Sequence, residues 1–118
     1  MAKAIKYYRN KADKLFQQWF IARHPKCEMC GAPAVCGHHY ITKSACSATR
    51  YYEPNMVAVC NGCHLGFHSN RSSVFNGKVV TKRGKAWWND LMVERRMIIK
   101  TNIGHYKSII EKYGQETT

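Results

Sequence analysis

The chain has 118 residues, with 19 Lys and Arg against 7 Asp and Glu, which gives a formal net charge of +12. This length predicts a single domain over residues 1–118. The excess positive charge favours a polyanionic partner, most often nucleic acid, over an anionic membrane surface or no specific partner. No run approaches the roughly 18 apolar residues of a membrane-spanning helix, and the N-terminus lacks an apolar signal segment. We therefore expect a cytoplasmic protein with no membrane partner.

Residues 3–23 predict an amphipathic helix that ends before Pro25. Apolar side chains recur at spacings of three and four on one face, and Lys and Arg occupy the other. The apolar positions are Ile5, Tyr8, Ala12, Leu15, Phe16, Trp19 and Phe20. The basic face could lie along a phosphate backbone or could simply be solvated.

Residues 26–70 form the segment that carries the chemistry. We expect a strand from Val35 to Ile41, a polar loop from Thr42 to Pro54, a second strand from Met56 to Val59, and a helix that begins near Cys63. The order is therefore strand, loop, strand, helix, with the cysteine pairs at its base.

The last third of the chain predicts mainly helix. Asn76-Gly77 is a turn signal between apolar pairs and allows a small hairpin. Residues 86–100 predict a helix whose apolar stripe continues as far as Ile98 and Ile99.

A final helix completes this C-terminal helical region, residues 85–114. Thr101 or Asn102 could cap its start, and Gly114 is expected to end it.

Two CxxC pairs predict a structural zinc site. A CxxC turn brings both sulfurs to one ion, and two such turns complete the four tetrahedral ligands that structural zinc prefers. The ligands are Cys27, Cys30, Cys60 and Cys63. In a reducing compartment such pairs bind metal rather than form disulfides. Cys36 and Cys46 have no CxxC partner, and we expect small buried residues there, with Cys36 as an alternative ligand.

The histidines predict a second metal site. His64 and His68 are four residues apart and share one face of the expected helix, whereas His38 and His39 point to opposite faces of the expected strand. One of that pair could bind the metal while the other has a different role. Imidazole ligands suit Mn²⁺, Ni²⁺ or Zn²⁺ better than Mg²⁺, and the identity of this divalent ion stays open.

His39, Asn55 and His64 are arranged like the three letters of the HNH, or His-Me finger, nuclease motif, which this chain resembles. The resemblance implies an α+β fold with a ββα-metal core, a zinc site of four cysteines at its base, and flanking N- and C-terminal helices. It also implies a hydrolase that cuts DNA with the help of a catalytic divalent metal.

Residues 11–70 resemble the phage NinG/Rap recombination family more closely. The string KADKLFQQWFIARHPKCEMCG is similar to that family's N-terminal helix and first knuckle. The string HHYITKSACSATRYYEPNMVAVCNGCHLGFHSN is similar to its HYISR, LRF and C-x-x-C-N blocks. The cysteine spacing also resembles that of the junction-resolving endonucleases of T-even phages. These resemblances imply cleavage of branched DNA such as Holliday junctions during phage recombination, in a bacterial host.

The resemblance assigns roles to the histidines. His39 matches the general base that takes a proton from the attacking water. His38 and His64 match metal ligands. His68 matches a third histidine ligand of some HNH nucleases, and Asn70 matches the terminal Asn of the NinG block, so both stay open.

Two further residues receive roles from the same resemblance. Asn55 would brace the loop through hydrogen bonds from its side chain to the backbone. Arg50 matches the Arg of LRF and could hold a phosphate oxygen, or could be a solvated loop residue.

Two alternatives remain for the function. One is an HNH nicking or homing endonuclease that acts on ordinary duplex DNA, and the other is a zinc-ribbon DNA-binding module with incidental histidines. Two symmetric cuts in a junction would favour a homodimer. Trp87 or Trp88, together with Trp19 and Phe20, could form its interface or lie in one intramolecular core.

Overall fold

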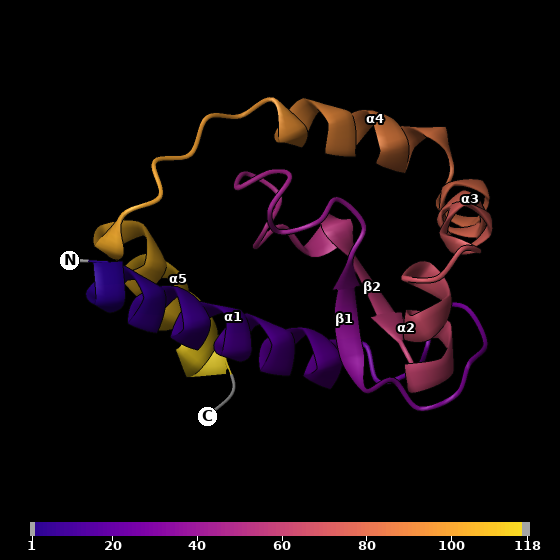
Figure 1. Ribbon diagram of the computed structural model, residues 1–118, viewed down its shortest axis with the longest axis horizontal. Coiled ribbons are helices and arrows are strands. Elements are labelled where there is room, and N and C mark those ends of the chain that lie inside the picture. The colour runs from indigo at the N-terminus through magenta and orange to yellow at the C-terminus, as the bar shows by residue number, and fades with distance from the viewer. Residues whose placement is uncertain (1, 117–118) are drawn as a thin grey trace.

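The computed structural model describes residues 2–116, which form an α+β fold dominated by helices around a small two-stranded sheet (Figure 1). The elements are α1 (Ala2–Arg23), β1 (Cys36–His39), the 3-10 turn η1 (Glu53–Asn55), β2 (Met56–Val59), α2 (Asn61–Phe67), α3 (Ser72–Arg83), α4 (Lys85–Arg95) and α5 (Ile103–Glu116). None of the helices in this range is long and apolar enough to cross a membrane.

The two strands are antiparallel, and their register decides which side chains share a face. Cys36 lies opposite Val59 and His38 opposite Val57, whereas Gly37 and His39 lie opposite Ala58 and Met56. Because side chains alternate along a strand, the two neighbouring histidines point to opposite faces of the sheet, as the sequence predicts. In Figure 1, α1 reaches the sheet from one side with α5 lying along it, and α2 lies on the other side of the sheet.

Each face of the sheet has its own core cluster. The α1 face packs Phe16, Phe20, Met56, Ala58 and Tyr113. The α2 face packs Cys27, Val57, Val59, Phe67 and Val79. The four residues of β2 are all buried, which explains why its sequence is a continuous apolar run rather than an alternating one.

Helix α1 confirms the prediction for residues 3–23 and also closes the outer edge of the sheet. The Gln17 amide donates to the carbonyl oxygen of Gly37 and accepts from its N–H, both at 2.8 Å. A side chain at position 37 would not fit, because a Cβ there would lie 2.8 Å from Phe20 and from Met56. Gly37 therefore lets α1 approach β1 closely.

The hairpin allowed around Asn76-Gly77 is wrong, because this segment lies inside α3. Phe75 and Val79 are one helical turn apart, and both pack into the α2-face cluster, with Val79 fully buried. Burial of this apolar pair outweighs the local turn preference of Asn-Gly.

The C-terminal boundaries also differ from the sequence prediction. α4 ends at Arg95, and Ile98 is 97% exposed instead of extending an apolar stripe. The cap at Asn102 is confirmed, because its side-chain oxygen accepts from the N–H of His105 at 2.8 Å. Gly114 does not end α5, which continues to Glu116.

The aromatic residues considered for a dimer interface pack within the chain. Phe20 is buried, and Trp19 and Trp87 pack against the two core clusters. The Trp88 ring lies 6.2 Å from the Tyr40 ring. Intramolecular packing thus accounts for Phe20, Trp19 and Trp87, whereas Trp88 is only half-buried, and the homodimer stays a prediction.

Candidate metal and catalytic site

The four cysteines of the two CxxC pairs come together at the base of the sheet. Their sulfur atoms all lie within 4.8 Å of one another, close enough to hold one metal ion. No disulfide forms among the described residues, and the sulfurs of Cys30 and Cys60 are 3.6 Å apart. The sequence prediction that these four cysteines come together in one group is therefore confirmed.

Local backbone geometry aims the sulfurs inward. The first pair turns through Gly31, whose φ of 81° favours glycine. The second pair is the start of α2, where Cys60 is the N-cap residue and its sulfur accepts from the Cys63 N–H at 3.5 Å. Burial would raise the pKa of the Cys27 thiol, but nearby backbone N–H groups and Cys30 lower it to about 6. This sulfur is therefore readily available as thiolate, the form that binds metal.

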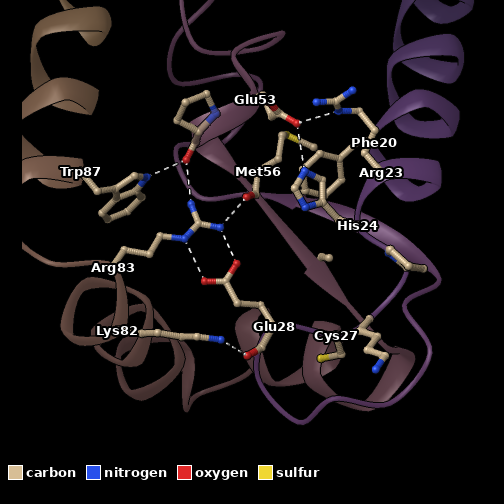
Figure 2. Close-up of a pocket in the computed structure, with 14 residues that line it drawn as sticks. Phe20, Arg23, His24, Cys27, Glu28, Glu53, Met56, Lys82, Arg83 and Trp87 are labelled. Atoms are coloured by element: carbon tan, nitrogen blue, oxygen red, sulfur yellow. Dashed lines mark hydrogen bonds and ion pairs between the residues drawn. The ribbon is translucent and has the colours of Figure 1, made fainter. Parts of the chain in front are cut away.

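An ion pair joins the first CxxC turn to the end of α3 (Figure 2). The Arg83 guanidinium pairs with the Glu28 carboxylate through two hydrogen bonds, one of them 2.8 Å long, and it donates to the carbonyl oxygens of Pro54 and Met56. The adjacent Lys82 donates to the main-chain oxygen of Glu28 at 2.8 Å. Glu28, Lys82 and Arg83, which line the cavity of about 650 Å³ between these residues, are thus already paired with one another or with main-chain oxygens.

Three histidines converge on the α2 face of the sheet. The ring nitrogens of His38, His64 and His68 can be chosen so that all lie within 4.8 Å of one another. The Nε2 atoms of His64 and His68 are 3.1 Å apart. α2 ends at Phe67, so His68 is its C-cap residue, and the two imidazoles nevertheless meet as the spacing of four predicts.

His38 is held rigidly at the centre of this histidine cluster. It is buried and stacks on Phe67, with ring centroids 4.5 Å apart. Burial, as the largest cause, and the charges that the neighbouring imidazoles would carry together lower its pKa to about 4. His38 is therefore neutral at pH 7, as a metal ligand must be.

Cys36 lies behind His64 rather than in the four-cysteine group. Its sulfur is 3.4 Å from Nδ1 of His64, the ring nitrogen that faces away from His68. Burial raises the pKa of the Cys36 thiol. The alternative of Cys36 as a ligand beside the CxxC pairs finds no support, since it contacts the histidine cluster instead.

His39 points to the other face of the sheet, toward α1 and the loop. Its Nε2 lies 2.9 Å from the main-chain oxygen of Arg50. Its pKa is lowered to about 4. Burial is the largest cause and the charges of Lys43 and Arg50 act in the same direction, whereas the hydrogen bond to Arg50 and the charge of Asp13 oppose it. A neutral imidazole that donates from Nε2 to a carbonyl oxygen keeps Nδ1 unprotonated, so Nδ1 is the basic atom of this side chain.

The side chain of Arg50 is already paired. Its Nε and Nη2 donate to the two carboxylate oxygens of Asp13 at 2.9 and 2.5 Å, and Tyr51 donates to the same carboxylate at 2.6 Å. Arg50 is thus not a solvated loop residue. It contributes its carbonyl oxygen to the site and anchors the loop to α1.

Asn55 is fully buried and braces the same loop. Its side-chain oxygen accepts from the N–H of Ile41 at 2.8 Å, and its amide donates to the carbonyl oxygens of Ile41 and Thr49 at 3.0 and 3.1 Å. The loop-bracing hydrogen bonds predicted for Asn55 are present. They join the end of β1 to the turn that carries Arg50.

A cavity of about 300 Å³ lies between His39 and the cluster of His38, His64 and His68. It is lined by Gln17, Cys36, Gly37, His38, His39, Thr42, Lys43, His64 and His68. His68 belongs to this lining and Asn70 does not, which favours His68 of the two open choices.

Sequence reasoning missed Asp13, Gln17 and Lys43. Asp13 and Gln17 lie on α1 and contact residues more than a dozen positions away, so only the fold reveals their part in the site. Lys43 could have been found from the sequence, because it is the last residue of the HYITK string.

One named protein is similar to part of the chain. An alignment 66 residues long, which covers 52% of this chain, is 39% identical to the mitochondrial DNA mismatch repair protein mutS homolog of Sarcophyton glaucum. The aligned segment is 7% of that protein's length, so the chain corresponds to a small part of it. No family model and no solved structure matches the chain.

Proposed function

We propose that this chain is a metal-dependent DNA endonuclease of the HNH, or His-Me finger, type. The observation that carries the proposal is the convergence of His38, His64 and His68 beside a separately oriented neutral His39 on one cavity. The order β1, β2, α2 is the order that such a ββα-metal core requires.

The four-cysteine group fits a structural zinc ion. Four sulfurs at about 2.3 Å from zinc in a tetrahedron lie roughly 3.8 Å apart. The 3.6 Å separation of Cys30 and Cys60 agrees with this value. Such a site would stabilise a module whose sheet has only two strands of four residues each.

The histidine cluster fits a second divalent ion. Nitrogen ligands at about 2.0–2.1 Å from a tetrahedral ion lie roughly 3.3 Å apart, close to the 3.1 Å between His64 and His68. Three protein ligands leave a position open for substrate, as catalytic metal sites do. In this arrangement Nδ1 of His64 would donate to the Cys36 sulfur, the type of outer contact that fixes the orientation of a ligating imidazole.

His39 fits the role of general base. Its Nε2 proton is engaged by the Arg50 carbonyl oxygen, so Nδ1 is left to take the proton of the attacking water. Asn55 holds the loop that carries this carbonyl. A bound divalent ion would neutralise charge on the phosphate and on the leaving oxygen.

DNA as the substrate is supported by charge and by the matched relative. The net charge of +12 favours a polyanion, and Lys43 places a cation in the lining of the histidine cavity. The relative is by its name a DNA repair protein. Lys43 could contact the scissile phosphate in place of Arg50, whose guanidinium is bound to Asp13.

Nicking of supercoiled plasmid by the zinc-loaded protein, with Mn²⁺, Ni²⁺ or Mg²⁺ added, tests the proposal. We expect His39→Ala to lower the rate by about 10²- to 10⁴-fold while DNA and Mn²⁺ binding remain. His64→Ala should lose the added metal. His24→Ala is the matched control, because His24 pairs with Glu53 outside the histidine cavity. Equal activity of wild type and His39→Ala would favour the zinc-ribbon alternative.

Preference for branched DNA is a separate part of the proposal. It comes from the resemblance to the NinG/Rap family, and a four-way junction beside a linear duplex of the same sequence tests it. Faster cleavage of the junction supports a recombination nuclease, and equal rates support a nicking enzyme for ordinary duplex DNA.

A further inference from the structure

One face of α1 is left open along most of its length. Tyr7, Lys11, Lys14 and Gln18 follow one another at spacings of four, three and four, so they form one stripe on the helix. All four are exposed, Tyr7 by 60%. The buried residues Ala12, Phe16 and Phe20 lie on a different face, toward the core. Apart from the edge contact of the Tyr7 ring with the Tyr8 ring, at 5.2 Å between centroids, the stripe is directed to solvent.

Three hollows lie in series from this stripe, and the third is the histidine cavity. The first, about 500 Å³, is lined by Tyr7, Asn10, Lys11, Lys14, Leu15 and Gln18. The second, about 540 Å³, shares Gln18 with the first and is also lined by Gln17, Ile21, Ala22, Val35 and Cys36. The histidine cavity in turn shares Gln17 and Cys36 with the second. Since neighbouring hollows share lining residues, they adjoin one another in a row along α1, which we call the α1 groove.

The chemistry of the groove suits an unpaired nucleic acid strand. Among the salt bridges of the described residues, none involves Lys11 or Lys14, so both ammonium groups are available to phosphates. Tyr7 offers an exposed aromatic face at the far end, and a base can stack on such a face only when it is not enclosed in a duplex. Asn10 and Gln18 add amide groups that can donate to phosphate and base oxygens.

The length of the groove suits a short stretch of single-stranded DNA. Ten residues separate Tyr7 from Gln17, which corresponds to about 15 Å along a helix. At about 3.4 Å per nucleotide of one strand, this is the length of about four stacked nucleotides.

We propose that the α1 groove binds one single strand of DNA and leads it into the histidine cavity, with Tyr7 stacked on a base and with Lys11 and Lys14 on phosphates. This inference deepens the proposed function, because the strand in the groove is the substrate of the cavity. It implies a substrate with an unpaired arm, flap or end beside the cleaved bond.

Anisotropy titration of a labelled single-stranded oligonucleotide of about twelve nucleotides tests the groove without any cleavage, in the full-length zinc-loaded protein carrying His39→Ala. The double variant Lys11→Ala, Lys14→Ala should weaken binding on the order of tenfold and reduce the slope of log K against log salt by about 1.4. Lys78→Ala with Lys100→Ala is the control. It removes the same charge from exposed positions that line none of the three hollows.

Two substitutions of Tyr7 test the stacking contact separately. Tyr7→Ala should weaken binding about fivefold, whereas Tyr7→Phe keeps the ring and should bind like the parent. Lysine acetylation read by mass spectrometry gives the location: bound DNA should protect Lys11 and Lys14 and leave Lys78 and Lys100 reactive.

Several outcomes would contradict the proposal that the α1 groove binds a single strand of DNA. They are equal losses in the two double variants, equal binding of Tyr7→Ala and Tyr7→Phe, or no protection of Lys11. If the double variant instead weakens only a blunt duplex, the single strand is the wrong occupant. A wild-type protein that binds through the groove but nicks no DNA would contradict the proposed nuclease and leave the groove intact.

Discussion

Asp13 and Arg50, which are 37 positions apart in the sequence, form a two-point ion pair that joins α1 to the loop between the strands. The same Arg50 holds His39 through its carbonyl oxygen. Burial would raise the pKa of Asp13, but hydrogen bonds from Arg50 and Tyr51 outweigh it and lower this pKa below its ordinary value. α1 is thus part of the support of the proposed general base.

Asp13→Asn should therefore slow DNA cleavage while leaving metal and DNA binding nearly unchanged. The amide cannot provide both charge-assisted hydrogen bonds to Arg50, so the carbonyl oxygen that orients His39 becomes mobile. We expect a fall of about tenfold in kcat and of about 2 kcal/mol in the free energy of unfolding. Single-turnover kinetics and urea unfolding measure the two effects. A variant with wild-type kcat but lowered stability would make Asp13 purely structural.

The pH dependence of this stability difference has a definite sign. The folded-state pKa of Asp13 lies below its ordinary value of 3.8, so the stabilisation is complete above that value. It is lost only as the pH falls through the lower folded-state pKa. The difference between wild type and Asp13→Asn should therefore be constant from about pH 5 to pH 8. A difference that grows or shrinks across this window would contradict the assignment.

Cys36 provides a second test, directed at the histidine cluster. Its sulfur lies 3.4 Å from Nδ1 of His64 and would fix the ring that presents Nε2 to a metal. We expect Cys36→Ala to lower the affinity for the added divalent metal by about 10- to 100-fold, with the structural zinc retained. Calorimetric titration with Mn²⁺ or Ni²⁺ measures this loss. Cys46→Ala is the control, since its sulfur lies near the carbonyl oxygen of Arg95, away from the cluster.

The four-cysteine site predicts a different response to substitution. If the proposed zinc is bound there, Cys60→Ser should release it and leave the protein largely unfolded, because Cys60 would be a ligand and is also the N-cap of α2. Zinc content by mass spectrometry, together with circular dichroism, measures the effect. A well-folded variant with an unchanged zinc content would disprove the site, and Cys46→Ser should bind zinc like the wild type.

The sequence predicts the local parts of this structure well. The CxxC turns, the helix spacing of His64 and His68, and the opposite directions of His38 and His39 depend on a few neighbouring residues each. Backbone geometry alone therefore determines them.

Contacts between distant segments could not be predicted from the sequence. The pairing of Asp13 with Arg50 and the cap of Gln17 on Gly37 bring α1 to residues of the module, and no periodic pattern reports such contacts. The error at Asn76-Gly77 has the same origin. The local turn signal is real, but burial of Val79 against the sheet decides the outcome.

Two glycines test the packing of α3 that replaced the expected hairpin. A Cβ at Gly66 of α2 would lie 2.3 Å from the Phe75 ring, so Gly66→Ala should destabilise the fold, by about 1–3 kcal/mol, because α2 and α3 must separate. Gly77 lies inside α3 with no atom within 4 Å of a Cβ built there. Gly77→Ala should therefore stabilise the protein by about 0.5–1 kcal/mol through helix propensity.

Urea unfolding of both alanine variants decides between helix and hairpin at this segment. In a hairpin, Gly77 would need the positive φ of a tight turn, and alanine there would destabilise the protein instead. Gly66→Ala combined with Phe75→Leu, which shortens the opposing ring, should recover part of the loss. Destabilisation by Gly77→Ala, or no recovery in the double variant, would contradict the contact between α2 and α3 that places His64 and His68 beside the sheet.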